Sequence, residues 1–139
     1  MSLAMIHFSI PIREIGSTLE FYRDVLGCEA TRVQEDRIDF DFFGHHLVAQ
    51  LSPEEAAHRS VSIGENSFPL RHLGVIVGED VYLGMLQKLR QARAPFAMEP
   101  KRIFVKTPRE QSVFLVYDPS GNAIEVKGLC QPEQVFSSH

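Results

Sequence analysis

Hydrophobic and polar positions follow the same order in two stretches of the chain. In the first, residues 6–12 form a short apolar run that is typical of a strand. Residues 17–27 then have the spacing of an amphipathic helix that ends at Gly27, and Ser17 with Glu20 has the form of a capping box at its start. The helical spacing rests on Leu19, Tyr22, Val25 and Leu26. Three expected strands follow, at residues 29–34, 37–43 and 46–51.

The same order restarts in the second half of the chain. Residues 71–77 predict a strand, and residues 79–94 predict a helix with an apolar stripe. That stripe consists of Val81, Met85, Leu86 and Leu89. Three more extended stretches are expected, at residues 96–105, 112–118 and 123–127. Between the halves, residues 52–69 carry prolines and serines without a sustained period, which indicates a linker with one helical turn at residues 53–58.

Short phrases of sequence repeat together with the pattern. IHFSI at residues 6–10 parallels RHLGV at residues 71–75, and GHHLV at residues 44–48 parallels GNAIE at residues 121–125. The chain therefore consists of two strand–helix–strand–strand–strand units, and a repeated unit of this size needs its neighbour to bury its sheet. We predict an α+β fold in which two paired βαβββ modules form a curved sheet around a shared cleft.

The length of 139 residues is the usual size of one compact unit, so we expect a single domain over residues 1–139. Its expected parts are module one at about 5–51, the linker at 52–69, module two at about 70–128 and a C-terminal tail at 129–139.

Composition narrows the classes of function. The chain has 14 basic and 18 acidic residues, so it lacks the basic surface of a nucleic-acid-binding protein. No apolar run approaches the roughly 18–20 residues that span a bilayer, so we expect no membrane partner. Cys28 and Cys130 stand far apart, and the chain shows no secretory signal. We therefore expect a reduced, cytoplasmic protein.

Three residues at repeated positions have the side chains of a metal site. His7 lies on the first strand of module one, His72 lies at the matching place in module two, and Glu125 lies on the last expected strand. Two imidazoles and one carboxylate bind a divalent first-row metal on one face and leave the opposite positions open for substrate and for O2 or water. Strand alternation places Glu125 on the face opposite Ile124 and Val126. A single His on a strand is more often a core or surface residue, and a single Glu usually faces water, but the repeated positions make these three the predicted metal ligands.

A second set of residues shares one face of the last strand of module one. His46, Val48 and Gln50 alternate onto this face, whereas His45 points to the other side and is expected to be solvated in the turn. Val48 is the positional counterpart of Glu125, so module one offers no carboxylate there. His46 or Gln50 is a candidate fourth ligand, and His46 is also the candidate catalytic acid or base beside the metal.

Other residues are candidate substrate contacts. Phe42 and Tyr117 are aromatic residues that could line the cleft or belong to the core. A cluster of basic residues in module two consists of Lys101, Arg102, Lys106 and Arg109. Arg102 is the candidate to meet a substrate carboxylate, and a solvated basic face is the alternative explanation for the cluster.

Five phrases give the chain a family resemblance: IHFSIP from residue 6, FYRDVLG from residue 21, DFDFFGHHLVAQL from residue 39, RHLGV from residue 71 and DPSGNAIEVK from residue 118. Over about residues 5–128 the chain resembles the vicinal oxygen chelate superfamily, which includes glyoxalase I, bleomycin-resistance proteins and extradiol dioxygenases. DFFGH and the stretch REQ at residues 109–111 are most similar to a small group of predicted extradiol-type dioxygenases.

The resemblance implies paired βαβββ modules, a homodimer and a divalent metal held by His7, His72 and Glu125. In the extradiol-type group, position 46 tends to be Gln and position 50 tends to be His. This chain has His46 and Gln50, which moves the imidazole by two strand positions.

Three functions fit these observations. The first is a metal-dependent dioxygenase that binds a small vicinal diol of the catechol type by direct chelation, with Fe(II) favoured over Zn, Ni, Mn or Co and with His46 as proton shuttle. The second is a glyoxalase-type isomerase or lyase, which usually needs a second metal-bound carboxylate. The third is a non-catalytic protein that binds a flat small-molecule drug, which would not need the intact ligand set. The predicted partners are therefore a small-molecule substrate and a second copy of the chain.

Overall fold

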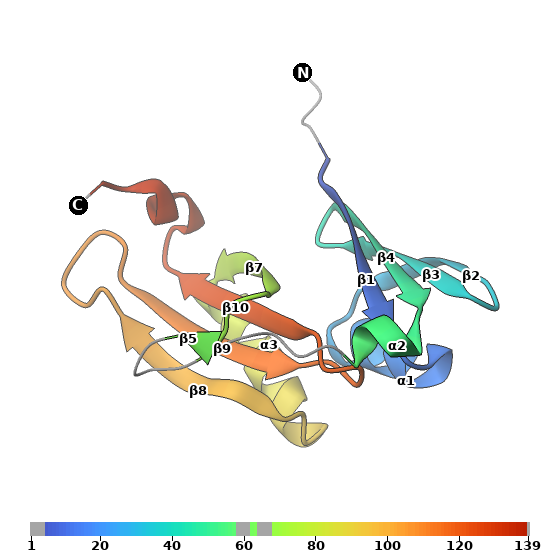
Figure 1. Ribbon diagram of the computed structural model, residues 1–139. Coiled ribbons are helices and arrows are strands. Elements are labelled where there is room, and N and C mark those ends of the chain that lie inside the picture. The colour runs from blue at the N-terminus through green and yellow to red at the C-terminus, as the bar shows by residue number, and fades with distance from the viewer. Residues whose placement is uncertain (1–4, 58–61, 64–67, 139) are drawn as a thin grey trace. The chain divides into compact units, whose positions relative to one another are not determined.

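The computed structural model describes residues 5–57, 62–63 and 68–138, and the chain divides into two units (Figure 1). Unit 1 takes in Met1–Arg59 together with Asp118–Asn122, and unit 2 takes in Ser60–Tyr117 and Ala123–His139. Each unit has its own four-stranded sheet. No helix in the described part of the chain is long and apolar enough to cross a membrane.

Unit 1 has the predicted order of a strand, a helix and three strands. Its elements are β1 (His7–Ile12), α1 (Ile15–Leu19), the π-helix η1 (Glu20–Val25), β2 (Glu29–Val33), β3 (Arg37–Phe42), β4 (His45–Leu51) and α2 (Pro53–Ala56). The sheet order is β1-β4-β3-β2, with β1 and β4 parallel and the other pairs antiparallel. Helix α2 confirms the expected helical turn as far as Ala56, and residue 58 lies outside the described residues.

The start of the first helix differs from the expected capping box. The cap residue is Glu14, whose carboxylate accepts a hydrogen bond from the Ser17 backbone N–H at 2.9 Å. The prediction that Ser17 caps the helix with Glu20 is therefore wrong. Ser17 already lies inside the helix, because the longer Glu14 side chain reaches forward over the first turn and satisfies its N–H. The predicted end at Gly27 is confirmed, since Gly27 has a φ of 77°.

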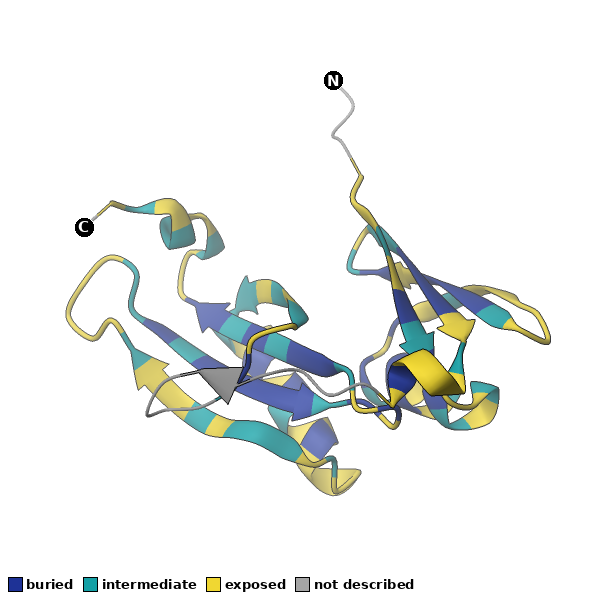
Figure 2. Ribbon diagram, viewed as in Figure 1, coloured by how far each residue is buried: buried dark blue, intermediate teal, exposed yellow. Residues whose placement is uncertain are grey.

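The sheet of unit 1 has one apolar face and one polar face. Figure 2 shows buried positions along β1, β3 and β4. The ring of Tyr22 packs against Phe40 in the same core. The largest buried side chains of this core are Ile12, Tyr22, Ile38, Phe40, Phe42 and Leu47. The opposite face carries His7, Ser9, Asp39, His46 and Gln50 around the buried Val48, and it is called the polar face below.

A buried network explains why Asp118–Asn122 belongs to unit 1. The Asp118 carboxylate accepts hydrogen bonds from the Tyr22 hydroxyl at 2.7 Å and from the backbone N–H groups of Ser120 and Asn122, each at 2.8 Å. The Asn122 amide donates to the Pro11 carbonyl at 2.9 Å. Burial raises the pKa of both the Asp118 carboxyl and the Tyr22 hydroxyl, and the nearby Asp118 charge raises the Tyr22 pKa further.

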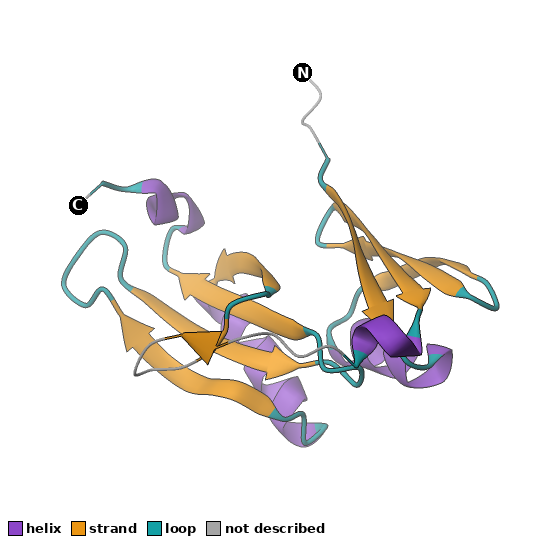
Figure 3. Cartoon of the chain, viewed as in Figure 1, coloured by secondary structure: helices purple, strands orange, loops and turns teal. Residues whose placement is uncertain are grey.

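Unit 2 repeats the order of unit 1. Its elements are β5 (Ser62–Ile63), β6 (Phe68–Pro69), β7 (Leu73–Gly78), α3 (Glu79–Gln91), β8 (Phe96–Ile103), β9 (Gln111–Tyr117), β10 (Ala123–Leu129) and the 3-10 helix η2 (Pro132–Phe136). The large sheet has the order β7-β10-β9-β8, in which β7 and β10 are parallel (Figure 3). The two short strands, β5 and β6, pair with each other inside the expected linker.

Helix α3 packs on one face of the unit 2 sheet through a stripe that differs from the expected one. Its buried residues are Tyr82, Met85 and Leu89, whereas Val81 is 51% exposed. The assignment of Val81 to the stripe is therefore wrong. The Tyr82 ring packs against Phe114 with ring centroids 5.1 Å apart. Burying this ring brings the residues three and seven positions after it to the same face of the helix.

Strand register confirms the internal repeat. Ser9 pairs with Val48 across the parallel β1 and β4, and Gly74 pairs with Glu125 across the parallel β7 and β10. These are the pairs that the repeated phrases place at equivalent positions. His72 lies one residue before β7, so the strand expected from residue 71 begins later. The α+β class and the βαβββ order of each unit are confirmed.

Candidate functional site

The polar face of the unit 1 sheet brings two of the candidate histidines side by side. His7 on β1 pairs in register with His46 on β4, and both rings lie on this face, with centroids 4.8 Å apart. Asp39 on the neighbouring strand β3 shares the face. On the same face, the Gln50 amide donates a hydrogen bond to the Ser9 hydroxyl at 2.7 Å. This confirms that His46 and Gln50 point to one side of β4.

His7, His46 and Asp39 form a continuous chain of side-chain hydrogen bonds. His7 Nδ1 and His46 Nδ1 are 2.8 Å apart, and His46 Nε2 is 2.9 Å from Asp39 Oδ2. Asp39 is only 7% exposed, and Arg37 Nε lies 3.4 Å from its other oxygen. The hydrogen bond from His46 lowers the pKa of the Asp39 carboxyl, and Arg37 acts in the same direction.

Unit 2 holds the other two predicted ligands close together. His72 Nε2 is 3.8 Å from Glu125 Oε1, and both side chains are largely buried. His72 Nδ1 is 2.9 Å from the Pro69 carbonyl oxygen, which only accepts, so Nδ1 carries the proton. Lys127 Nζ lies 3.6 Å from the same Glu125 oxygen and balances its charge.

A glycine fixes the backbone beside Glu125. A Cβ atom on Gly74 would lie 2.1 Å from the backbone oxygen of Glu125 and 3.1 Å from its Cβ. No side chain larger than hydrogen fits there without moving β10. Gly74 therefore allows β7 to approach the strand that carries the carboxylate.

The donor chemistry of these residues fits a divalent cation. In His72, Nδ1 is hydrogen-bonded to the Pro69 carbonyl, and Nε2 faces a carboxylate oxygen of Glu125. Donors bound about 2.0–2.2 Å from one ion stand roughly 3.0–3.5 Å apart, which a small side-chain rotation reaches from 3.8 Å. Within each unit, the described residues include no group of three or more His, Cys, Asp and Glu that could hold a metal alone. The structure thus brings His72 and Glu125 together in unit 2 and places His7 with His46 in unit 1.

The remaining predicted residues occupy different surroundings. Phe42 is 2% exposed and packs on Phe8 and Phe43, so the structure places it in the core and not on the polar face of unit 1. Tyr117 is half-buried and pairs with Ala123, on the same face of the sheet as Glu125.

Arg102 and His45 also have definite partners. Arg102 is exposed, donates to the Ser112 hydroxyl at 2.9 Å and lies 3.4 Å from Glu110 and 3.6 Å from Glu79. His45 was expected to be solvated, but its Nδ1 accepts the Ile6 backbone N–H at 3.1 Å, which ties the start of β1 to β4.

Sequence reasoning missed Asp39 and Lys127. A signal for Asp39 exists, because it alternates with Ile38 and Phe40 on a strand joined to β4 by a tight turn. Pairing those strands across Gly44 places Asp39 on the His46 face. Lys127 stands two residues after Glu125, so strand alternation alone puts both on one side.

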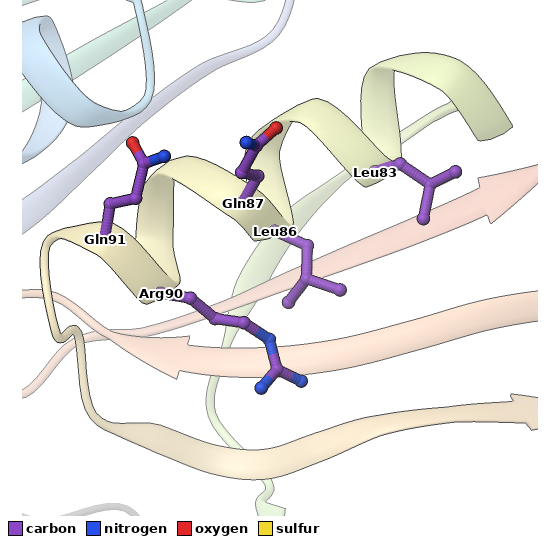
Figure 4. Close-up of a pocket in the computed structure, with 5 residues that line it drawn as sticks. All are labelled: Leu83, Leu86, Gln87, Arg90 and Gln91. Atoms are coloured by element: carbon purple, nitrogen blue, oxygen red, sulfur yellow. The ribbon is translucent and has the colours of Figure 1, made fainter.

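Two pockets lie away from the candidate residues. One, of about 460 Å³, lies on the outer side of α3 and is lined by Leu83, Leu86, Gln87, Arg90 and Gln91 (Figure 4). The other, of about 240 Å³, includes Cys28, and burial raises the pKa of that thiol to about 12. A buried thiol of such high pKa is an inert core group. Cys130 is exposed, and neither cysteine forms a disulfide.

Comparisons with known proteins place the chain in a family. The family model described as the glyoxalase/bleomycin resistance protein/dioxygenase superfamily matches residues 4–126. A solved glyoxalase/bleomycin resistance protein/dioxygenase from Alicyclobacillus acidocaldarius is 28% identical, covers 96% of both chains and has a TM-score of 0.75. No curated protein matches the chain.

Two more distant structures share the fold alone. The fosfomycin resistance protein FosX from Listeria monocytogenes is 11% identical, with 96% of this chain and 98% of that chain covered and a TM-score of 0.73. The lactoylglutathione lyase from Agrobacterium tumefaciens is 15% identical, with 96% of both chains covered and a TM-score of 0.66. Because the family model spans most of its residues, the chain belongs to the glyoxalase/bleomycin resistance protein/dioxygenase superfamily.

Proposed function

We propose that the protein is a metal-dependent enzyme that binds a small vicinal diol, and that His7, His72 and Glu125 hold one divalent cation. The observation that carries this proposal is the state of His72. Its Nδ1 donates to the Pro69 carbonyl, so Nε2 is the ring nitrogen left to face the Glu125 carboxylate, 3.8 Å away. His7 occupies the equivalent place in the repeat and also engages its Nδ1 within the protein.

The reaction that fits this ligand set best is oxygenation of a catechol-type substrate, with Fe(II) as the favoured metal. When bound, the metal offers open coordination positions for two substrate oxygens and for O2. The chain itself orients the ligands and supplies contacts to the substrate. Gln50 and Tyr117 are the proposed contacts, and Arg102 is the proposed partner for a substrate carboxylate.

Unit 1 supports oxygenation over isomerisation. An isomerase of the glyoxalase type uses a second carboxylate as base, and the place equivalent to Glu125 holds Val48, which is buried. His46 does not replace that base freely, because both its ring nitrogens already lie within hydrogen-bond distance of His7 and Asp39. We therefore assign His46 to the support of His7 in place of the expected proton shuttle.

The test begins with metal content. Protein purified without chelators and reconstituted anaerobically with Fe(II) is expected to bind one metal ion per chain, and Glu125→Gln is expected to lower metal affinity at least 100-fold. Glu99→Gln is the matched control, because Glu99 is an exposed residue of β8. Equal metal binding by Glu125→Gln and the control would contradict the proposed ligand set.

The reaction class is tested on the loaded protein. Oxygen uptake across a panel of catechols is expected, and thiol-dependent conversion of methylglyoxal is not. Methylglyoxal conversion without oxygen uptake would replace the dioxygenase with the isomerase. A drug-binding protein of the same fold would show neither activity and would keep its ligand affinity in His7→Ala. Sedimentation is expected to show a homodimer.

A further inference from the structure

The side chains behind His7 form an ordered sequence of donors and acceptors. A carboxylate is an acceptor only, and the lowered pKa of Asp39 keeps it ionised at neutral pH. Its partner, His46 Nε2 at 2.9 Å, must therefore be the donor. A neutral imidazole carries a single N–H, so a proton on Nε2 leaves His46 Nδ1 as an acceptor.

The same reasoning reaches His7 one bond further along. His7 Nδ1 lies 2.8 Å from His46 Nδ1, and two acceptors would not approach so closely. His7 Nδ1 is therefore the donor, which in a neutral ring leaves His7 Nε2 with a lone pair and no proton. His7 is exposed at the start of β1, so this lone pair is open to a ligand.

Unit 2 reaches the same state by a different route. There the acceptor for His72 Nδ1 is a backbone carbonyl, which cannot donate. In unit 1 the acceptor for His7 is an imidazole, and each of its nitrogens can be a donor or an acceptor, depending on which one carries the proton. Asp39 places the His46 proton on Nε2, because its buried carboxylate only accepts.

We infer that Asp39 and His46 are positioning residues that hold His7 in the Nδ1-protonated tautomer, with Nε2 ready for a cation. This inference rests on the proposed function, in which His7 is a metal ligand. Neither residue touches the cation in this arrangement. Asp39 acts on His7 only through His46, so its effect on His7 must disappear when His46 is removed. Outer partners of metal-binding histidines commonly change metal affinity by about 10–100-fold.

The test reads the tautomer in metal-free protein. Long-range ¹H–¹⁵N correlation spectra, recorded at about pH 8 where free imidazole is neutral, distinguish Nδ1-protonated from Nε2-protonated histidine. Wild type is expected to show His7 protonated on Nδ1 and His46 protonated on Nε2. His7 protonated on Nε2, or His46 carrying both protons, would overturn the inference.

Variants separate positioning from a general structural role. Asp39→Leu removes the acceptor and is expected to release His7 from the Nδ1 tautomer, whereas Asp39→Asn retains an acceptor oxygen and is expected to restore it. His46→Leu is expected to match Asp39→Leu, and adding Asp39→Leu to His46→Leu is expected to change nothing further. Arg37→Gln is the control, because it removes the other side-chain partner of Asp39 and leaves the His46 bond intact.

Metal titration completes the test and separates the proposed metal binding from the inferred His7 tautomer. Co(II) affinity measured by calorimetry is expected to fall about 10–100-fold in Asp39→Leu and to stay near wild type in Asp39→Asn and Arg37→Gln. If Asp39→Leu does not fold, His46→Asn, which retains an acceptor near Nδ1 but loses the link to Asp39, is compared with His46→Leu. The expected tautomers without metal binding by wild type would reject the proposed function and not the tautomer. Metal binding with an unchanged His7 tautomer in every variant would reject the inference alone.

Discussion

The two units repeat one order of elements but support their histidines in different ways. In unit 1 side chains do this, since His46 receives the Nδ1 proton of His7 and Asp39 orients His46. In unit 2 the backbone does it, since the Pro69 carbonyl receives the proton of His72. A carbonyl acceptor persists when a side chain is replaced, whereas the unit 1 chain can be broken by one substitution. The repeat thus preserves the place of each histidine and leaves its support free to differ.

The buried tyrosines of the two units also differ in how their hydroxyls are bonded. Tyr22 of unit 1 donates its hydroxyl to Asp118 at 2.7 Å. Tyr82 of unit 2 is equally buried, but its hydroxyl has no hydrogen-bond partner among the described residues. Unit 2 relies instead on close backbone approach, because Gly128 leaves room for the Tyr82 ring and Gly74 leaves room for the strand of Glu125.

The largest expected effect comes from filling the space at Gly74. In Gly74→Ala the new Cβ would lie 2.1 Å from the backbone oxygen of Glu125, so β7 and β10 must separate there. We expect the free energy of unfolding to fall by about 3 kcal/mol, at the upper end of overpacking costs, and metal affinity to fall with it. Urea denaturation and metal titration measure the two effects.

Gly84→Ala is the matched control in the same unit. Gly84 lies inside α3, and a Cβ there meets nothing within 4 Å. Alanine is expected to stabilise the helix by about 0.5–1 kcal/mol. Similar changes in stability for Gly74→Ala and Gly84→Ala would show that backbone approach at Glu125 is not tight.

The next largest effect is the difference in stability between variants of the two buried tyrosines. Tyr22→Phe removes a hydrogen bond to a charged carboxylate and is expected to lower the free energy of unfolding by about 2 kcal/mol. Tyr82→Phe removes a buried hydroxyl that has no partner in the described structure, so it is expected to be neutral or to stabilise by up to about 1 kcal/mol. Thermal and urea unfolding of the two variants measure the difference, and equal losses would remove the contrast between the units.

The fold could be predicted from sequence wherever a local period decides the structure. Strand alternation and helical spacing placed every large strand and α3, and the repeat of phrases placed Val48 and Glu125 at equivalent positions, which the strand pairing confirms. Two predictions were wrong, the Ser17 cap and the place of Val81 in the stripe of α3, because a neighbouring residue takes the expected role. Glu14 satisfies the N–H of Ser17 before a Ser17 cap can form, and Tyr82 takes the place in the stripe that was expected for Val81.

The candidate site could be predicted only as far as the residues that we propose as ligands. His7, His72 and Glu125 follow from residue type and repeat. Of their supports, Asp39 has a sequence signal, because strand alternation and the turn at Gly44 place it on the His46 face. The contact of Pro69 with His72 has none, because it depends on the path of the backbone. The path of the backbone before β7 does not follow from the hydrophobic period of the chain.

The smallest expected effect is the pH dependence of the contribution that Asp39 in unit 1 makes to the free energy of unfolding. The hydrogen bond from His46 holds the pKa of Asp39 in the folded protein below its ordinary value of 3.8. A group whose pKa is lowered by folding stabilises the fold above its unfolded pKa and loses that contribution as pH falls through the folded pKa. Wild type is therefore expected to exceed Asp39→Asn in free energy of unfolding by about 1 kcal/mol or less at neutral pH. The difference is expected to shrink as pH falls below about 4.

Urea denaturation at a series of pH values between neutral and strongly acidic measures this difference. Asp36→Asn is the control, because Asp36 is exposed in the turn between β2 and β3. The expected result is a stability gap that closes only in the acid range for Asp39→Asn. A gap that widens on acidification would mean that the Asp39 carboxylate opposes folding, and the side-chain support of His7 would then be a source of strain in unit 1 that the backbone support of His72 avoids in unit 2.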